Sequence, residues 1–165
     1  MFKNRSFCFW ERLKNRKGFT LTELTVTLSI LGIMTAISVP SYFSWLPRHR
    51  LQTSARQIYD DMNLAKIRAV KDNTYARITF NTANETYTVF LDLNNDGVQN
   101  DGPTTIIRNN ASLENGVDIT AANTCGFNNR GMSTTGAPQI SLTNPTNIIM
   151  RINVTTAGNI SIVTL

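Results

Sequence analysis

The sequence predicts an α+β protein, in which a long helical region precedes a mostly antiparallel β region. Three observations lead to this fold class. Residues 19–39 form an apolar run with a single charge, and residues 48–71 carry apolar side chains at helical spacing. From residue 75 onward, short stretches alternate between apolar and polar side chains, and residues typical of turns separate them.

The apolar run is long enough to cross a membrane. As a helix, its 21 residues would extend for about 32 Å, which matches the hydrocarbon core of a bilayer. Residues 1–18 carry six cations and one acid, which is the whole net charge of +5, so this end is expected to stay in the cytoplasm. Pro40 has no backbone N–H to donate, and we expect the helix to kink there.

The single charge in the run is Glu23, four residues after Phe19. An unpaired carboxylate in lipid costs about 2.5–3.5 kcal/mol. In one interpretation, Glu23 lies near the helix end and reaches the membrane surface. In the other, it pairs with a positive group once the helix leaves lipid for a protein assembly. The second interpretation needs a partner that carries a cation into an apolar environment.

Residues 48–71 predict an amphipathic helix that ends at Asp72-Asn73 and packs on a sheet. Its apolar stripe recurs at steps of three and four, through Leu51, Ala55, Ile58, Met62, Ala65 and Ala69. The other faces are charged, and we expect Asp60 and Asp61 to be ordinary solvated side chains. One long helix that continues from the apolar run is the simplest layout.

The remainder predicts short strands joined by turns. The expected strands are 75–80, 86–91, 104–107, 117–120, 139–142, 147–154 and 159–163, with Cys125–Phe127 before a turn at 128–131. Residues 155–158 read as the turn of a final hairpin. Cys125 is expected to be a small buried residue, because the other cysteine, Cys8, lies before the apolar run.

Residues 17–24, with the sequence KGFTLTEL, strongly resemble the class III signal of type IV pilins and type II secretion pseudopilins. The resemblance implies that a prepilin peptidase removes residues 1–18 by cutting between Gly18 and Phe19, and then methylates the new amino group of Phe19. It also implies that Glu23 guides docking into a growing filament, and that Pro40 loosens the helix. An anchor helix at 19–47 and a periplasmic or extracellular domain at 48–165 would follow.

The resemblance narrows to minor pseudopilins of the GspH/FimT type. The run 65–71 resembles their helix in part, with Lys66 and Arg68 in place of the family's Arg and Glu, and 127–131 resembles their turn. This implies a pilin-like fold in which one long helix packs against two small sheets. It also implies a subunit that primes or caps filament assembly at the inner membrane, with other pilins, the prepilin peptidase, the assembly platform and membrane lipid as partners.

DNA capture by a competence pilus is the alternative function, because some FimT-type proteins use a Gly-Arg-x-Arg run near the carboxyl end. The corresponding place here is 158–161, which lacks both arginines. After residue 73 the domain has four arginines and six acids, a poor electrostatic footprint for phosphate. We therefore expect no nucleic-acid partner. Catalysis also finds no support, since the single histidine, His49, lies between two arginines and no nucleophile or phosphate-loop motif occurs.

One loop carries oxygen ligands at the spacing of a calcium loop. Asp92, Asn94 and Asp96, with the carbonyl of Val98 and the carboxylate of Asp101, could surround a hard cation. The twelfth position of the pattern is a proline, where an EF-hand has a bidentate glutamate. The alternative is a hairpin loop without metal, in which Asn and Asp side chains bond to their own backbone.

Overall fold

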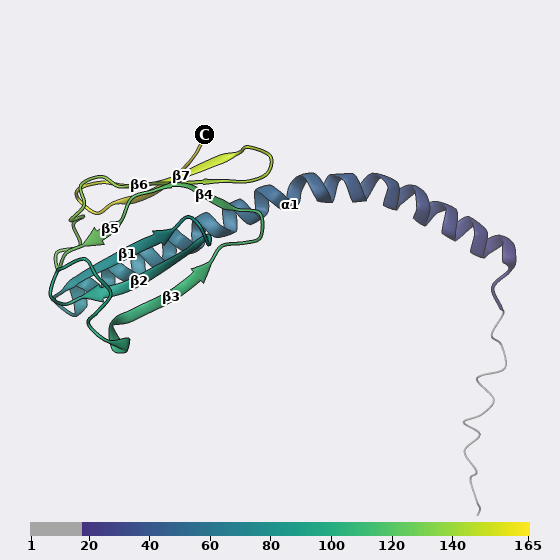
Figure 1. Cartoon of the computed structure of the whole chain (residues 1–165). Helices are drawn as coiled ribbons and strands as arrows, with labels where there is room; N and C mark the ends of the chain where they lie inside the picture. The colour runs from purple at the N-terminus through teal and green to yellow at the C-terminus, as the bar shows by residue number, and fades with distance from the viewer. Residues whose placement is uncertain (1–17) are drawn as a thin grey trace, which may run out of the picture. The chain divides into compact units, whose positions relative to one another are not determined.

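The computed structural model describes residues 18–165, so the leader predicted at 1–18 lies outside the described residues except for Gly18. Helix α1 (Leu21–Lys71) comes first and is followed by eight strands (Figure 1). The chain divides into two compact units, one up to Tyr42 and one from Phe43 to Leu165, and α1 contributes residues to both.

The strands form two antiparallel sheets. The first has the order β3-β2-β1-β5 and is built from β1 (Tyr75–Asn81), β2 (Thr86–Asp92), β3 (Ile106–Ser112) and β5 (Cys125–Phe127). The second has the order β4-β6-β7-β8 and is built from β4 (Asp118–Ala122), β6 (Gln139–Thr143), β7 (Ile149–Val154) and β8 (Ile160–Thr164). This confirms the predicted fold class and its two small sheets.

The core of the second unit lies between α1 and the two sheets. All six apolar residues of the predicted helical stripe are buried, and they share one core with residues of both sheets such as Ile78, Phe127 and Ile152. Figure 1 shows β1 and β2 lying along this part of α1. Cys125 belongs to the same core and is fully buried, as expected. Burial raises the pKa of its thiol to about 12.

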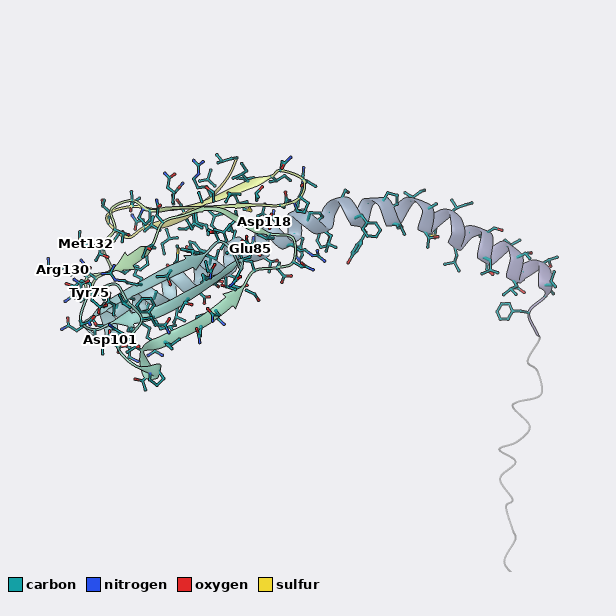
Figure 2. The ribbon with its side chains drawn as sticks, in the orientation of Figure 1. Tyr75, Glu85, Asp101, Asp118, Arg130 and Met132 are labelled. Atoms are coloured by element: carbon teal, nitrogen blue, oxygen red, sulfur yellow. The ribbon has the colours of Figure 1, made fainter. Side chains whose placement is uncertain are left out.

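Glu85 joins the two sheets. It occupies the turn between β1 and β2 with a positive φ of 51°, and its carboxylate accepts a hydrogen bond of 2.6 Å from the backbone N–H of Ile119 in β4. Figure 2 marks Glu85 beside Asp118, at the start of that strand. A charged acceptor makes this bond stronger than one between neutral groups. The bond therefore holds the β1–β2 turn of the first sheet against strand β4 of the second.

The third predicted strand is displaced. The 104–107 stretch begins instead as a short 3₁₀ turn, η2 (Pro103–Thr105), and β3 runs from Ile106 to Ser112. Pro103 cannot donate to a strand ladder, whereas it suits the first turn of a helix. The extension through Asn109 and Asn110 was missed because asparagine disfavours strands, and register shifts against β2 accompany it.

The apolar part of α1 has no protein cover. The helix contains a stretch long and apolar enough to span a membrane, with a mean hydropathy of 1.7, and none of it is buried. Five hydroxyl side chains within it bond back to carbonyls of the preceding turn, at distances of 2.8 to 3.0 Å: Thr25, Thr27, Ser29, Thr35 and Ser38. Their polar groups are thereby satisfied without water, which suits an apolar environment.

Both prolines of α1 lie within the assigned helix, which continues through Pro40 and Pro47. Each removes one helical hydrogen bond without ending the element. The kink expected at Pro40 stays a prediction, as do the domain boundaries drawn at 18/19 and 47/48.

Candidate functional site

The amino-terminal end of α1 leaves the expected cleavage point accessible. Gly18, Phe19 and Thr20 precede the helix and are exposed. A β-carbon added to Gly18 would meet no atom within 4 Å, so the fold of the described chain does not require glycine there. An exposed, non-helical peptide bond between Gly18 and Phe19 is the geometry that a peptidase needs.

Thr20 caps the helix. Its hydroxyl accepts a hydrogen bond of 3.2 Å from the backbone N–H of Glu23, which makes Thr20 the N-cap and places Glu23 three residues on. The spacing Thr-x-x-Glu is that of a capping box, and this signal could have identified Thr20 from the sequence. Glu23 therefore has a local role as well, because a carboxylate in the first turn is favourable beside the positive end of the helix dipole.

Glu23 has no ion-pair partner among residues 18–165. Its side chain is exposed, at the start of a helix whose neighbouring apolar side chains are exposed too: Leu21 is 79% and Leu24 is 54% exposed. The charge is thus available to a cation from outside the described chain.

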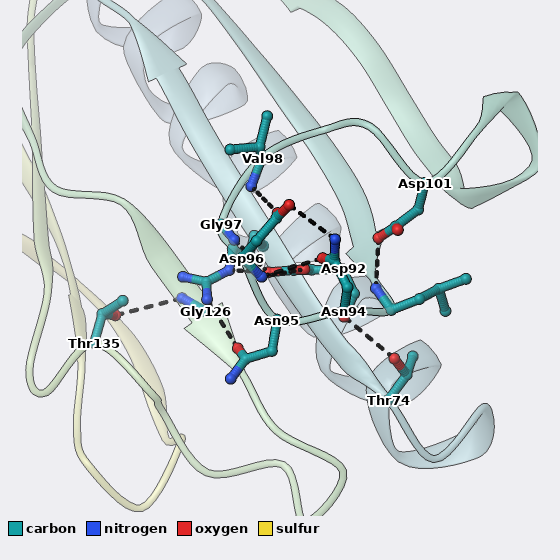
Figure 3. A network of polar contacts seen from close by, with 12 residues as sticks. Thr74, Asp92, Asn94, Asn95, Asp96, Gly97, Val98, Asp101, Gly126 and Thr135 are labelled. Carbon is teal, nitrogen blue, oxygen red and sulfur yellow. Dashed lines mark hydrogen bonds and ion pairs between the residues drawn. The ribbon is translucent and has the colours of Figure 1, made fainter.

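The loop after β2 is closed by its own polar groups, as Figure 3 shows. The carboxylate of Asp92 is fully buried, pairs with the guanidinium of Arg77 and accepts the backbone N–H groups of Asp96 (3.1 Å) and Gly97 (3.0 Å). Arg77 also donates to Asn95 across 2.9 Å. A buried carboxylate needs a cation and hydrogen bonds, and Asp92 has both.

The remaining candidate calcium ligands are engaged within the same loop. Asp96 accepts from the Val98 N–H (2.7 Å) and from the amides of Asn94 and Asn100 (2.8 Å each), and these bonds lower the pKa of its carboxyl, the Val98 bond most. Asp101 accepts from the Leu93 N–H across 2.6 Å. No cluster of three acidic, histidine or cysteine side chains within residues 18–165 is arranged to hold a metal.

This donor set does not fit a calcium ion as it is arranged. The guanidinium of Arg77 contacts the one fully buried carboxylate, so a divalent ion at Asp92 would face a like charge. The carbonyl of Val98 and the carboxylate of Asp101 already accept hydrogen bonds from the backbone N–H groups of Asn100 (3.0 Å) and Leu93 (2.6 Å). The geometry favours the alternative of a loop without metal, and calcium binding stays a prediction.

We expect Arg77→Gln to destabilise the domain by about 3 kcal/mol, because it leaves the buried Asp92 carboxylate without its cation. The measurement is urea unfolding of the full chain in detergent. Arg130→Gln is the matched control, since Arg130 is exposed, and it should change the unfolding free energy by less than about 0.5 kcal/mol. A chelator should leave the melting temperature of the wild type unchanged; a clear fall would instead support calcium in the loop.

Asp61 corrects a prediction. It was expected to be solvated, but it is only 4% exposed. Its carboxylate accepts the hydroxyl of Tyr87 across 2.5 Å and two bonds from Arg108, of 3.1 and 2.9 Å. Burial and then this carboxylate raise the pKa of Tyr87, so its hydroxyl remains a donor. The apolar stripe of α1 faces the core, and Asp61, which precedes Met62 of that stripe, is buried with it.

Replacing Asp61 with Asn should destabilise the protein by about 2–3 kcal/mol, because Tyr87 and Arg108 lose a charged acceptor. Asp60→Asn is the matched control: Asp60 is its exposed neighbour, and its replacement should have an effect below about 0.5 kcal/mol. Thermal unfolding of the two variants side by side tests the assignment. Equal melting temperatures would mean that the buried network contributes nothing.

The turn at 128–131 packs against the turn of the final hairpin, a contact that sequence reasoning missed. Ser133 donates its backbone N–H to the carbonyl of Thr156 (3.1 Å), and Lys66 of α1 donates to the carbonyl of Gly158 (2.9 Å). Figure 2 marks this turn by Arg130 and Met132. Gly158 is buried with a positive φ of 79°, and a β-carbon there would overlap the carbonyl oxygen of Gly131. Glycine is therefore required by the approach of two backbones.

Comparisons with known proteins agree with this description. The chain matches the model described as "Type II transport protein GspH" over residues 54–158, and that of the "Prokaryotic N-terminal methylation motif" over residues 13–39. A fimbrial protein of Pseudomonas aeruginosa is 35% identical over 46 residues, which are 28% of this chain. The match spans only 30% of the length of that relative.

Two solved structures share the fold. The type IV minor pilin FimU of Pseudomonas aeruginosa superposes with a TM-score of 0.54 at 15% identity, over 70% of this chain and 90% of that one. The minor pseudopilin EpsH from the type 2 secretion system of Vibrio cholerae gives 0.54 at 15% identity, over 70% and 97%. At this identity the similarity shows a common architecture.

An exposed apolar helix that leads into a helix-and-two-sheet domain defines a pilin-like structural subunit. Its class is that of the minor pilins and pseudopilins of type IV pilus and type II secretion systems. Because the family model covers most of its length, the chain belongs to the GspH family of type II transport proteins.

Proposed function

We propose that this chain is a minor pilin or pseudopilin that primes or caps the assembly of a type IV pilus or a type II secretion pseudopilus. One observation carries the proposal: no residue in the apolar part of α1 is buried, and its single charge, Glu23, has no ion-pair partner within residues 18–165. Such a surface must be covered by lipid or by other apolar helices. A subunit that moves from a membrane into a filament meets each in turn.

Processing at the amino-terminal end comes first. A prepilin peptidase would cut between Gly18 and Phe19 and methylate the amino group of Phe19. The exposed, non-helical backbone at this point and the methylation motif at 13–39 support this step. The subunit would sit in the inner membrane with a cytoplasmic amino terminus, and its globular unit would lie on the other side.

Assembly then exchanges lipid for protein. Apolar helix packing supplies most of the association free energy, and the carboxylate of Glu23 pairs with the methylated amino terminus of a neighbouring subunit. A buried charge that fails to find its partner is costly, so the pair sets the register of the incoming helix. Other pilins or pseudopilins and the assembly platform of the inner membrane are the partners in this step.

The test is deletion of the gene, with sheared surface filaments counted by electron microscopy and type II secretion assayed on the same strain. We expect loss of filaments or of secretion, restored by the wild-type gene and not by a variant that cannot be cleaved at Gly18. Normal filaments together with normal secretion would contradict a role in priming.

The DNA-receptor alternative has less support, because two of the four arginines after residue 73 are already paired. Arg77 is bound to Asp92 and Arg108 to Asp61. We expect no gel shift of double-stranded DNA by the full chain in detergent at low salt. A shift that fades with added salt would revive the alternative.

A further inference from the structure

A polar and aromatic patch lies at the start of the globular unit, on one face of α1. Positions 45, 48, 49 and 52 are three or four residues apart, so their side chains share that face. The rings of Trp45 and His49 stack with their centroids 4.5 Å apart and their planes at 16°. Arg48 lies between them in sequence and is exposed, and no ion pair joins it to another of the described residues. Trp45 itself is 52% exposed.

A cavity opens directly beside this patch. It has a volume of ≈ 290 Å³, and Arg48, Leu51 and Gln52 of α1 line one side of it. Ile148, Met150 and Leu165 line the other. Leu165 is held there by its N–H, which donates to the carbonyl of Ile149 across 2.9 Å, and yet its side chain is 60% exposed. The lining of the cavity is therefore mixed: Arg48, Gln52 and Thr164 are polar, and the other four side chains are apolar.

This combination of side chains matches the chemistry of a membrane surface. Tryptophan prefers the headgroup level of a bilayer, because its apolar ring is partly removed from water there while its N–H can still donate a hydrogen bond. Arginine binds phosphate through planar paired donors. Trp45 follows the end of the apolar run at Val39 by six residues, and six residues of helix extend for about 9 Å. That length reaches the outer side of the headgroup layer, which is about 5–7.5 Å deep.

We propose that Trp45, Arg48, His49 and the adjoining cavity form a binding site for the headgroup of an anionic phospholipid. The guanidinium of Arg48 holds the phosphate, the Trp45–His49 stack lies beside it on the outer side of the headgroup layer, and the cavity next to Arg48 receives the rest of the headgroup. The site seats the globular unit on the membrane before the subunit is extracted. This proposal rests on the membrane-anchored state in the proposed function, but not on cleavage or on filament assembly.

The sequence offers an internal probe for the test. The chain has two tryptophans, Trp10 and Trp45, so Trp10→Phe leaves Trp45 alone. The full chain is placed in two preparations of phosphatidylcholine nanodiscs, each with a minor fraction of a brominated lipid. In one preparation the brominated lipid is phosphatidylglycerol, and in the other it is phosphatidylcholine. Bromine near the upper part of the acyl chain quenches a tryptophan at the interface.

We expect Trp45 to be quenched by both lipids, and more strongly by brominated phosphatidylglycerol, because a surface cation enriches an anionic lipid about five-fold at its side. Arg48→Gln should remove the difference between the two lipids. Arg56→Gln, eight residues further along the same helix, should leave it unchanged. Equal quenching by the two lipids in the wild type would overturn the proposal. Flotation of the same chain with vesicles is the control for membrane anchorage, and a chain that floats but is quenched by neither lipid would overturn the proposal as well. Failure to float would instead refute membrane anchorage and thus the proposed function itself.

Discussion

Glu23→Ala is expected to leave cleavage after Gly18 intact and to reduce recovery of the chain in sheared filaments by at least about ten-fold. The variant removes the only carboxylate from the apolar part of the helix, so the amino terminus of the neighbouring subunit enters the assembly without a counter-charge. Removing one partner of a buried ion pair costs about 3–5 kcal/mol, which is larger than most single contacts between helices. The measurement is quantitative immunoblotting of sheared and membrane fractions.

Glu23→Gln separates pairing from capping. Glutamine serves in a capping box as glutamate does, so the bond between the Thr20 hydroxyl and the backbone N–H of residue 23 should persist. Only the charge is lost. We therefore expect Glu23→Gln to fail in incorporation nearly as badly as Glu23→Ala, whereas Thr20→Ala should weaken only the first helical turn, by about 1 kcal/mol. Normal incorporation of Glu23→Gln would reduce the role of Glu23 to capping.

Gly158→Ala should be the most destabilising single methyl addition in the domain. A non-glycine residue in the left-handed region costs about 1–2 kcal/mol, and the added β-carbon would also collide with the carbonyl of Gly131. Because a backbone atom cannot swing aside as a side chain can, the hairpin turn must move and the bond from Lys66 is strained. A total cost above about 3 kcal/mol would be a large part of the stability of a typical domain.

The matched control is Gly136→Ala. Gly136 also has a positive φ, of 82°, but a β-carbon there meets nothing within 4 Å, so this variant should carry the conformational cost alone. Cys125 supplies the readout once the other cysteine is replaced by serine, because its fully buried thiol reacts only when the core opens. Labelling of Cys125 should be at least about ten-fold faster in Gly158→Ala than in Gly136→Ala. Equal rates would show that the contact with Gly131 is not required.

The pH of that labelling experiment matters. Burial raises the pKa of the Cys125 thiol to about 12, whereas an unfolded thiol ionises near pH 8.5. A raised folded-state pKa stabilises the native state fully below the unfolded value, and this contribution is lost as the pH rises toward 12. Labelling near pH 7.5 therefore reports opening without destabilising the protein through the thiol.

Patterns with a physical period could be predicted from the sequence. The six stripe residues of α1 are buried because their spacing follows the turn of a helix, and the hairpins at 75–92 and 149–164 follow from alternation on either side of turn residues. The exposed apolar helix was equally evident, since composition alone identifies it. The processing point between Gly18 and Phe19 and the assembly role of Glu23 stay predictions, which rest on the resemblance of residues 17–24 to the class III signal.

Features set by distant contacts could not be predicted. Asp61 looks like a surface charge until β2 and β3 place Tyr87 and Arg108 beside it, 26 and 47 residues away in sequence. The requirement for glycine at 158 depends on a turn from another part of the chain. The pairing of Arg77 with Asp92 likewise needs the register of β1 and β2, which brings the two side chains to one end of the sheet. Local spacing contains none of this information.

Mass spectrometry of the amino-terminal peptide, recovered from sheared filaments and from membranes, tests the central claim most directly. The account predicts that filaments contain this chain beginning at an N-methylated Phe19, and that membranes contain both this form and the precursor. Recovery of the chain from membranes alone, still beginning at Met1, would contradict its role as a filament subunit.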